Sequence, residues 1–316
     1  MKTYRQKHAA TARRPALHGV RLRSLLLALL IAPALLFAAP AATAEEKSIV
    51  WAMNDFPPNF IFPDGKLPTT AAELGQGYGD RSMANIIARL PQYQHQFLQA
   101  NVPRIMAQME HGLNLCFASV NKTPSREKFA YFTPIFLHPP MGLVILHDRP
   151  STSALQKGPQ SLATILKEHK DFQGYVESGR SYNPDIDSLI SQGNSGLQKI
   201  TVPNTGHLLR MLDAGRMDYT LEYPMMVEYQ SKKMIVKNKL SVIPLVEAPE
   251  WIASYVACTR NPWGQERIHD IEAAIRDAAR SQAFRDSLTQ WIPPEYLAEN
   301  RAKLKGFYDN LAKNPH

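Results

Sequence analysis

Two segments of the chain, about one hundred residues apart, carry the same order of sequence signals. Residues 101–119 read NVPRIMAQMEHGLNLCFAS, and residues 204–222 read NTGHLLRMLDAGRMDYTLE. In each, an Asn suited to cap a helix is followed by apolar residues at helical spacing and then by a glycine suited to end that helix. Short strands are predicted after the glycines, at 113–118 and 217–221. The repetition is compatible with any α/β protein, and it also indicates two lobes of similar build.

Other segments predict further strands and helices. Strands are expected at 48–53, 95–100, 142–146, 172–179 and 251–258, and a helix at 80–90. The C-terminal third is expected to be helical, because Ile268, Ile271, Ile275 and Ala279 form one apolar stripe. Pro293 and Pro294 mark the end of one helix and the start of the last. The alternation of strands and helices predicts an α/β fold with largely parallel sheets.

The first 44 residues predict a secretory signal peptide. A basic stretch precedes the apolar run at 25–39, and Ala42 and Ala44 fit a cleavage site after Ala44. The alternative is an uncleaved anchor, although the run is short for crossing a bilayer. The formal net charge of +8 and pI of about 9.4 arise mainly in this leader, since the remainder holds 29 Lys and Arg against 28 Asp and Glu. We therefore expect an exported, periplasmic protein with no nucleic-acid partner.

The sequence has only two cysteines, Cys116 and Cys258. In an oxidising compartment such a pair fits one disulfide, which would close a large loop. Two buried free thiols would fit the same sequence. Neither cysteine nor any histidine has metal-ligand spacing, so we expect no metal and no cofactor.

A lone arginine stands in the polar segment NKTPSREKFAYFTP, residues 121–134. Arg126 precedes an aromatic, strand-like run. A guanidinium in such a loop is either solvated surface or a fixed cation for an external carboxylate, with which it can form two parallel charge-assisted hydrogen bonds.

The longer segment SVNKTPSREKFAYFTP resembles a motif of the periplasmic solute-binding proteins of extracellular family 3, which bind polar amino acids. That motif is Ser-x-Ser/Thr-x-Thr-x-x-Arg followed by an aromatic-rich run. NDFPPNFIFPDGK at 54–66 and LDAGRMDYTLEY at 212–223 are similar to two weaker motifs of the family. The resemblance covers about residues 48–312 and implies a two-lobe, type II periplasmic-binding-protein-like fold with a hinge of two crossing strands.

The resemblance also implies a ligand site between the lobes. In the first lobe, Phe56 corresponds to an aromatic wall. Ser119 and Asn121 correspond to the loop that binds a ligand carboxylate, and Arg126 to the arginine that clamps it. Asn121 stands where the family often has Ser or Thr.

In the second lobe, Gly179, Arg180 and Ser181 match a ligand-binding turn near a helix N-terminus. The family's amino-group acceptor is usually an Asp five residues after the strand residue that is here Asp218. That position is Tyr223, and the nearest acid, Glu222, comes one residue earlier, which in a strand reverses the side-chain direction. Which of the two faces the ligand stays open, as does recognition of an α-amino group.

These observations predict a monomeric solute-binding protein for a small, polar, carboxylate-bearing ligand, amino-acid-like in character. The expected boundaries are 1–44 for the signal peptide, 45–143 and 258–316 for the first lobe, and 144–257 for the second, with the hinge near 142–147 and 252–258. The partner would be an inner-membrane ABC permease. Two alternatives remain: a sensor module that docks on a membrane signalling protein, and a cyclohexadienyl-dehydratase-like lyase with Glu222 as general acid or base.

Overall fold

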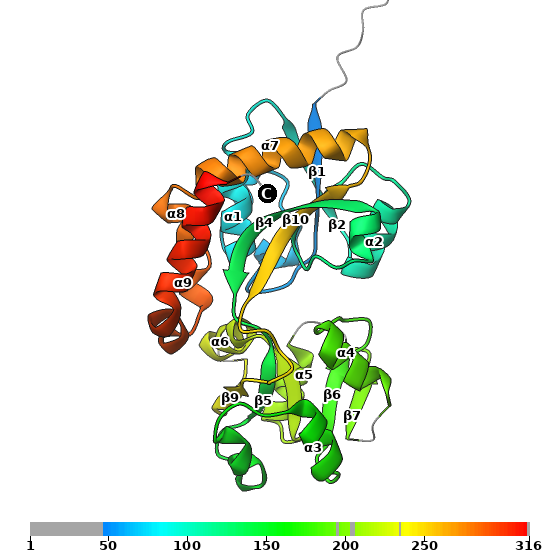
Figure 1. The fold of residues 1–316 in the computed structure, drawn as a ribbon, viewed down its shortest axis with the longest axis vertical. Coiled ribbons are helices and arrows are strands. Elements are labelled where there is room, and N and C mark those ends of the chain that lie inside the picture. The colour runs from blue at the N-terminus through cyan, green and yellow to red at the C-terminus, as the bar shows by residue number, and fades with distance from the viewer. Residues whose placement is uncertain (1–46, 194–195, 203–205, 234, 315–316) are drawn as a thin grey trace, which may run out of the picture. The chain divides into compact units, whose positions relative to one another are not determined.

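The computed structural model describes residues 47–193, 196–202, 206–233 and 235–314. Within these residues, two five-stranded sheets flanked by helices form the two lobes of an α/β fold (Figure 1). The leader predicted at 1–44 and the helix cap predicted at Asn204 lie outside the described residues. No helix in the described ranges is long and apolar enough to cross a membrane.

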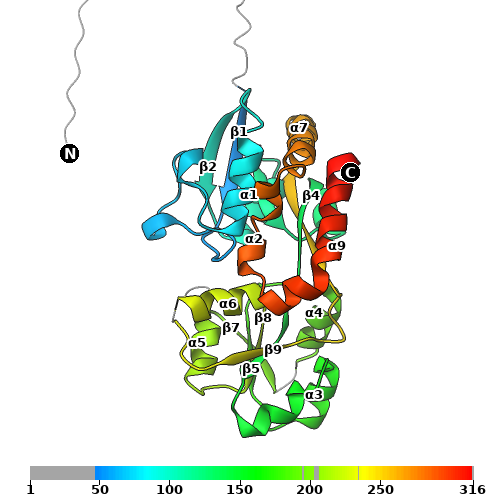
Figure 2. The same ribbon diagram turned by 90° about the vertical axis from the view of Figure 1, so that its left-hand side faces the viewer.

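The first sheet has alternate residues of its central strands packed into two apolar layers. Ile49, Trp51 and Met53 are fully buried on one face, and Ala52 belongs to the layer on the other. Figure 2 shows α7 and α9 beside β4 on the first of these faces. The strand order is β2 (Gln94–Gln99), β1 (Ser48–Met53), β3 (Cys116–Val120), β10 (Ile252–Thr259), β4 (Ala130–His138). The helices of this lobe are α1 (Tyr78–Ile87), α2 (Val102–Glu110), α7 (Pro262–Ala278), α8 (Gln282–Arg285) and α9 (Pro294–Lys313).

The second sheet is built in the same way. Leu143 and Ile145 pack against α3 and α4, whereas Val144 packs against α5 and α6. The strand order is β7 (Leu197–Ile200), β6 (Gly174–Glu177), β8 (Tyr219–Glu222), β5 (Gly142–Leu146), β9 (Leu240–Ile243). The helices are α3 (Leu162–Glu168), α4 (Pro184–Ser191), α5 (His207–Asp213) and α6 (Pro224–Lys232). Short 3₁₀ turns are η1 (Pro63–Gly65), η2 (Ala71–Glu73), η3 (Arg126–Lys128), η4 (Pro150–Gln156) and η5 (Thr289–Trp291).

The sheets are mixed: in each, four strands run in one direction and one strand, β10 or β5, runs in the other, so the prediction of largely parallel sheets holds for strand direction but not for every strand pair. Strand β1 is parallel to β2 and β3, but β10 is antiparallel to β3 and β4. Likewise β6 is parallel to β7 and β8, whereas β5 is antiparallel to β8 and β9. The reason is connectivity: β4 carries the chain out of the first lobe through 139–141, and β10 begins where the chain returns through 244–251. An outgoing and a returning strand paired side by side run in opposite directions.

Both helix–glycine–strand units predicted from the sequence are present. In the first, the side chain of Asn101 accepts the backbone N–H of Arg104, and α2 ends before Gly112, which has a φ of 81°. In the second, α5 ends before Gly215, with a φ of 70°. The strand of the first unit starts at Cys116, three residues later than predicted at its N-terminal end.

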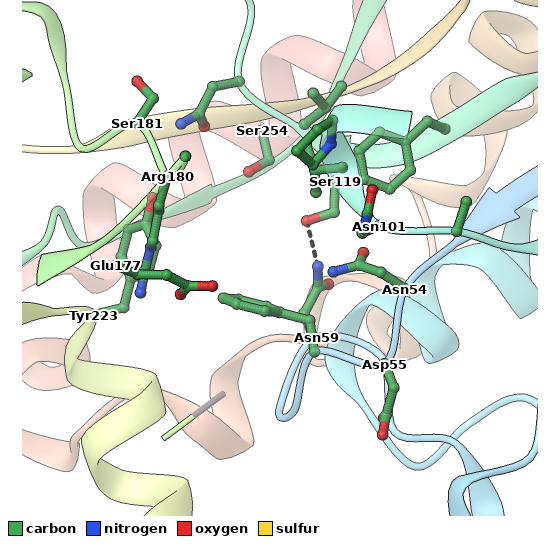
Figure 3. Close-up of a pocket in the computed structure, with 18 of the residues that line it drawn as sticks. Asn54, Asp55, Asn59, Asn101, Ser119, Glu177, Arg180, Ser181, Tyr223 and Ser254 are labelled. Atoms are coloured by element: carbon green, nitrogen blue, oxygen red, sulfur yellow. Dashed lines mark hydrogen bonds between the residues drawn. The ribbon is translucent and has the colours of Figure 1, made fainter. Parts of the chain in front are cut away.

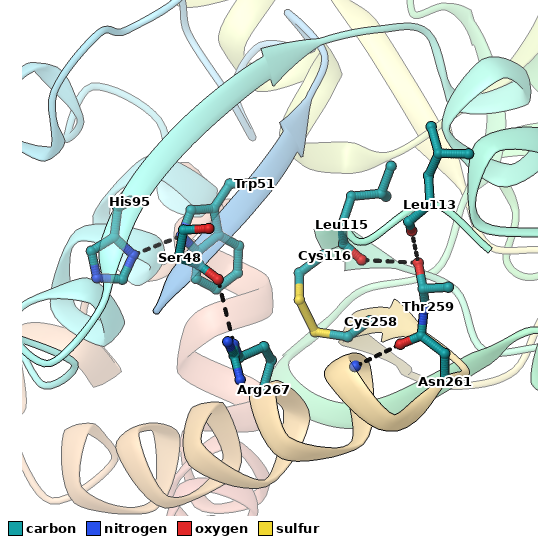
Figure 4. Close-up of a disulfide and its surroundings, with 11 residues drawn as sticks. Ser48, Trp51, His95, Leu113, Leu115, Cys116, Cys258, Thr259, Asn261 and Arg267 are labelled. Carbon is teal, nitrogen blue, oxygen red and sulfur yellow. Dashed lines mark hydrogen bonds between the residues drawn. A yellow bond between two sulfur atoms is a disulfide. The ribbon is translucent and has the colours of Figure 1, made fainter. Parts of the chain in front are cut away.

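Cys116 on β3 and Cys258 on β10 are register partners with Cα atoms 4.1 Å apart, and they form a disulfide (Figure 4). Both cysteines are fully buried. The bond therefore joins two strands at the centre of the first sheet that are 142 residues apart in sequence.

Candidate functional site

A cavity of about 680 Å³ is lined by residues of both lobes (Figure 3). Its volume falls within the range of small-molecule sites, on the order of 300–1,000 Å³. The loops that follow β1, β2 and β3 line it from the first lobe. The turn after β6 and the residue after β8 line it from the second. Every site residue proposed from the sequence lines this cavity except Glu222.

Arg126 opens η3 after β3 and is half-buried. Its Nη1 donates to the backbone oxygen of Asn121 at 2.8 Å. No carboxylate in the described part of the chain forms an ion pair with it, and its neighbour Glu127 is bound by Lys122 at 2.9 Å. Burial lowers the pKa of Arg126, but an arginine remains charged at neutral pH. The cavity is thus lined by a cation whose charge is not balanced by any carboxylate of the described residues.

Ser119 lines the cavity and lies at a bulge in β3. Val120 pairs with Tyr255 and Phe117 with Ala257, so β3 has one residue more than β10 in this interval. Ser119 has a φ of 65°, in the left-handed region that a serine rarely adopts. Bulges and such strained residues occur often beside binding sites, where they redirect a side chain. Its Oγ accepts a hydrogen bond of 2.8 Å from Nδ2 of Asn59, a cavity residue the sequence analysis missed.

Aromatic rings form one wall of the cavity. The rings of Phe56 and Tyr223 lie 5.7 and 5.6 Å from Cζ of Arg180, within reach of a cation–π contact. Tyr223 also packs edge-on against His138, with ring centroids 5.1 Å apart. Tyr223, which follows β8 and precedes α6, lines the cavity where its neighbour Glu222 does not.

Glu222 is instead paired with Arg180. Nη2 and Nη1 of Arg180 donate to its two carboxylate oxygens at 2.6 and 2.8 Å. The side chains are 14% and 7% exposed, respectively. Burial alone would lower the pKa of Arg180, but the Glu222 carboxylate raises it overall. Arg180 therefore lines the cavity with a charge that is already balanced inside the protein.

The turn after β6 is held in place by Asp187 in the first turn of α4. Its two carboxylate oxygens accept the Oγ–H of Ser181 at 2.6 Å and the backbone N–H of Tyr182 at 2.8 Å. Gly179 has a φ of 81°, which lets the chain turn sharply here. Gly179 and Ser181 consequently both line the cavity.

Two further polar groups at the cavity were not predicted. His138, the last residue of β4, is fully buried, with its ring nitrogens 3.0 Å from Oγ of Ser254 and 2.9 Å from the backbone oxygen of Pro139. Burial lowers the pKa of His138 to about 4, so its ring is neutral at pH 7. Glu177, the last residue of β6, also lines the cavity. The sequence signal for Glu177 was its position at the end of a strand directly before a glycine turn, where α/β proteins place ligand contacts.

The chemistry of this cavity favours binding of an anion beside apolar surface. Arg126 offers charge-assisted donors, Asn59 and Ser119 add neutral polar groups, and Phe56 offers an apolar face. Among the described residues, no group of three His, Cys, Asp or Glu side chains is arranged to hold a metal ion.

No protein-family model and no curated protein matches the sequence. Solved structures do match. A probable amino-acid ABC transporter extracellular-binding protein of Bacillus subtilis, YtmK, has a TM-score of 0.58 at 16% identity, over 79% of this chain and 99% of that chain. A putative L-cystine ABC transporter protein of Listeria monocytogenes has the same score and identity over 79% and 97%. The periplasmic VFT2 domain of Bordetella pertussis BvgS has a TM-score of 0.54 at 14% identity over 78% and 94%. These similarities show the two-lobe fold of type II periplasmic binding proteins.

Proposed function

We propose that the protein is an exported solute-binding protein that captures a small, polar, carboxylate-bearing ligand between its two lobes. Arg126 clamps the carboxylate, and Ser119 and Asn121, from the end of β3 and the residue after it, line the same cavity. Phe56 and Tyr223 cover the apolar part of the ligand. Binding energy then favours the closed arrangement of the lobes.

The observation that carries this proposal is the state of Arg126. Its guanidinium is half-buried in a cavity of ligand size, and its one hydrogen bond among the described residues goes to a backbone oxygen. Two other half-buried arginines lie outside the cavity: Arg149 pairs with Asp218 at 2.7 Å, and Arg81 donates to the backbone oxygen of Gly75. Arg126 combines the missing carboxylate partner with a place in the cavity wall, where a ligand carboxylate can supply the counter-ion.

Export and the partner are part of the proposal. The basic and apolar leader supports secretion with cleavage after Ala44. Solved structures with the same fold include proteins described as parts of amino-acid ABC transporters. We propose that the protein acts as a monomer that delivers its ligand to an inner-membrane permease, with no cofactor.

A thermal-shift screen of the mature protein with the twenty L-amino acids, L-cystine and small organic acids tests the proposal. A ligand at 100-fold its dissociation constant stabilises by about 2.7 kcal/mol, which is a clear rise in melting temperature. Arg126→Ala should abolish that rise while leaving the melting temperature of the ligand-free protein nearly unchanged. Arg126→Lys should keep only part of it, because lysine cannot make the two parallel bonds.

Arg149→Ala provides the matched control. Arg149 pairs with Asp218 and does not line the cavity, so its loss should lower the stability of the free protein but leave the ligand-induced rise intact. The proposal fails if Arg126→Ala destabilises the ligand-free protein as Arg149→Ala does, or if it retains the full ligand response.

The sensor alternative has one supporting observation. Solved structures with this fold include a histidine kinase sensor domain and the BvgS domain. Ligand capture is the same in both roles, and binding of the closed form to a membrane signalling protein would separate them. The lyase alternative is less well supported, since the carboxylate of Glu222 is bonded to Arg180 and Glu222 does not line the cavity.

A further inference from the structure

We propose that the ligand also carries a positively charged group and that the carboxylate of Glu177 receives it. This inference rests on the proposed function and narrows its ligand class from carboxylates to zwitterionic molecules such as amino acids. The sequence had left recognition of an amino group open, because Tyr223 occupies the position where an acid was expected.

Glu177 is placed where a ligand can reach it. It ends β6, whose neighbours β7 and β8 run parallel to it, and the carboxyl ends of parallel strands are the edge at which α/β proteins bind ligands. Figure 3 shows its carboxylate extending into the cavity from the second lobe, toward the side where Asn54 and Asn59 lie. It is therefore a cavity group and not a surface acid.

The carboxylate of Glu177 has no partner among the residues that the structure describes. Within the described residues it accepts no hydrogen bond and forms no ion pair, although the backbone N–H of Glu177 donates to Oη of Tyr182. The residue is half-buried, and burial raises the pKa of its carboxyl group against the opposing effect of Arg180. A partly desolvated carboxylate without a donor is costly, and such groups in native proteins usually have a functional reason.

The charges around the cavity complement a zwitterion. The charges of Arg180 and Glu222 balance each other in their ion pair, and the ring of His138 is neutral at pH 7. This leaves Arg126 as an uncompensated cation from the first lobe and Glu177 as an uncompensated anion from the second. A ligand with one carboxylate and one ammonium or guanidinium group would satisfy both, whereas a simple carboxylate would satisfy only the first.

Asp55, the other acid at this cavity, is less suited to the role. It is exposed, and its Oδ1 already accepts the backbone N–H of Phe62 at 3.2 Å. Figure 3 shows its side chain directed away from Glu177 and Ser119. Glu177 is thus the cavity-lining acid whose two carboxylate oxygens accept no hydrogen bond from the described residues.

The test compares ligands that differ only in the cationic group. Each amino acid that raises the melting temperature of the wild-type protein is paired with the analogue that has hydrogen in place of the α-amino group. For lysine and arginine the pairs also include L-norleucine and L-norvaline, which lack the side-chain cation. Isothermal titration then gives dissociation constants for wild type, Glu177→Gln and the control Glu168→Gln, an exposed glutamate of the same lobe outside the cavity.

We expect wild type and Glu168→Gln to prefer the cation-bearing member of a pair by about tenfold or more, the size of one charge-assisted hydrogen bond. Glu177→Gln should remove this preference, by weakening binding of the cation-bearing member while leaving its analogue within about threefold of wild type. Loss of the preference for either the α-amino or the side-chain cation supports the inference.

Two results overturn it. Equal weakening of both members of a pair by Glu177→Gln means that Glu177 acts within the protein, for example by pairing with Arg126 on closure. An unchanged preference in Glu177→Gln means that another group receives the cation. These failures differ from failure of the proposed function, in which no carboxylate gives an Arg126-dependent response at all.

Discussion

The guanidinium of Arg180 and the carboxylate of Glu222 form two hydrogen bonds of 2.6 and 2.8 Å in the wall of the cavity. Their side chains are 14% and 7% exposed, and the backbone N–H of Tyr223 donates a further bond to Glu222. The pair joins the turn after β6 to the end of β8, across 42 residues of sequence. Such a buried pair adds little net stability over an apolar pair, but it leaves an uncompensated charge when one partner is removed.

Glu222→Ala should therefore lower the free energy of unfolding by about 3–5 kcal/mol, because it leaves Arg180 buried and unpaired. The double variant Arg180→Ala/Glu222→Ala should lose less than the sum of the two single variants, since neither charge remains. Urea unfolding followed by circular dichroism measures both. Glu228→Ala, which breaks a more exposed pair with Lys232, should change stability by no more than about 0.5 kcal/mol. Additive losses in the double variant would show that the two residues are not coupled.

The sequence predicted those parts of the fold whose signals are local. The Asn101 cap of α2, the glycines that follow α2 and α5, and the apolar strand at Gly142–Leu146 each depend on residues within a few positions, and the structure contains them. The direction of strand pairing was not predictable in this way. It depends on where the chain crosses between lobes, and β10 is inserted between β3 and β4 from more than one hundred residues away.

The same contrast holds for the candidate site. Arg126 and Ser119 could be proposed because they belong to one continuous motif. The pairing of Arg180 with Glu222 could not, since it requires β6 and β8 to be neighbours in the second sheet. Asn59 and Ser119 likewise meet only because β1 and β3 are paired. Glu177 had a positional signal, but one that many strand ends share.

Replacing both cysteines by alanine should destabilise the protein strongly. Cys116 and Cys258 close a loop with a sequence separation of 142, and the loop-entropy model assigns such a cross-link about 4–5 kcal/mol. Cys116→Ala/Cys258→Ala should accordingly unfold at lower urea concentration than the oxidised wild type. Wild type that is unfolded and refolded in reductant should match the variant. If reduced wild type keeps the stability of the oxidised protein, the bond contributes nothing to stability.

Ser119→Ala should lower stability by about 1–3 kcal/mol, although Ser119 is only one hydroxyl. Its Oγ is the acceptor for Nδ2 of Asn59, whose side chain is buried, so the substitution leaves a desolvated donor without a partner. The double variant Asn59→Ala/Ser119→Ala should show a coupling energy of at least about 0.5 kcal/mol between the two sites. Urea unfolding of the three variants measures this coupling, and its absence would mean that the bond does not form in solution.

His138 should make the protein less stable as the pH falls. Its pKa is about 4 in the folded protein because the ring is buried, whereas a histidine in the unfolded chain titrates near its usual value of 6.5. Between these values the unfolded state binds more protons, so stability rises with pH and is lost as the pH drops from about 6.5 toward 4. The full effect is up to about 3 kcal/mol.

A comparison of wild type with His138→Asn isolates this effect. Burial raises the pKa of Asp80 to about 6, which makes the protein more stable as the pH falls, but Asp80 is present in both proteins. The unfolding free energy of wild type minus that of His138→Asn should therefore be smaller at about pH 4.5 than at about pH 7. The exposed-site control His269→Asn should follow wild type at both pH values. Parallel pH profiles for wild type and His138→Asn would contradict a neutral, buried His138 beside Ser254.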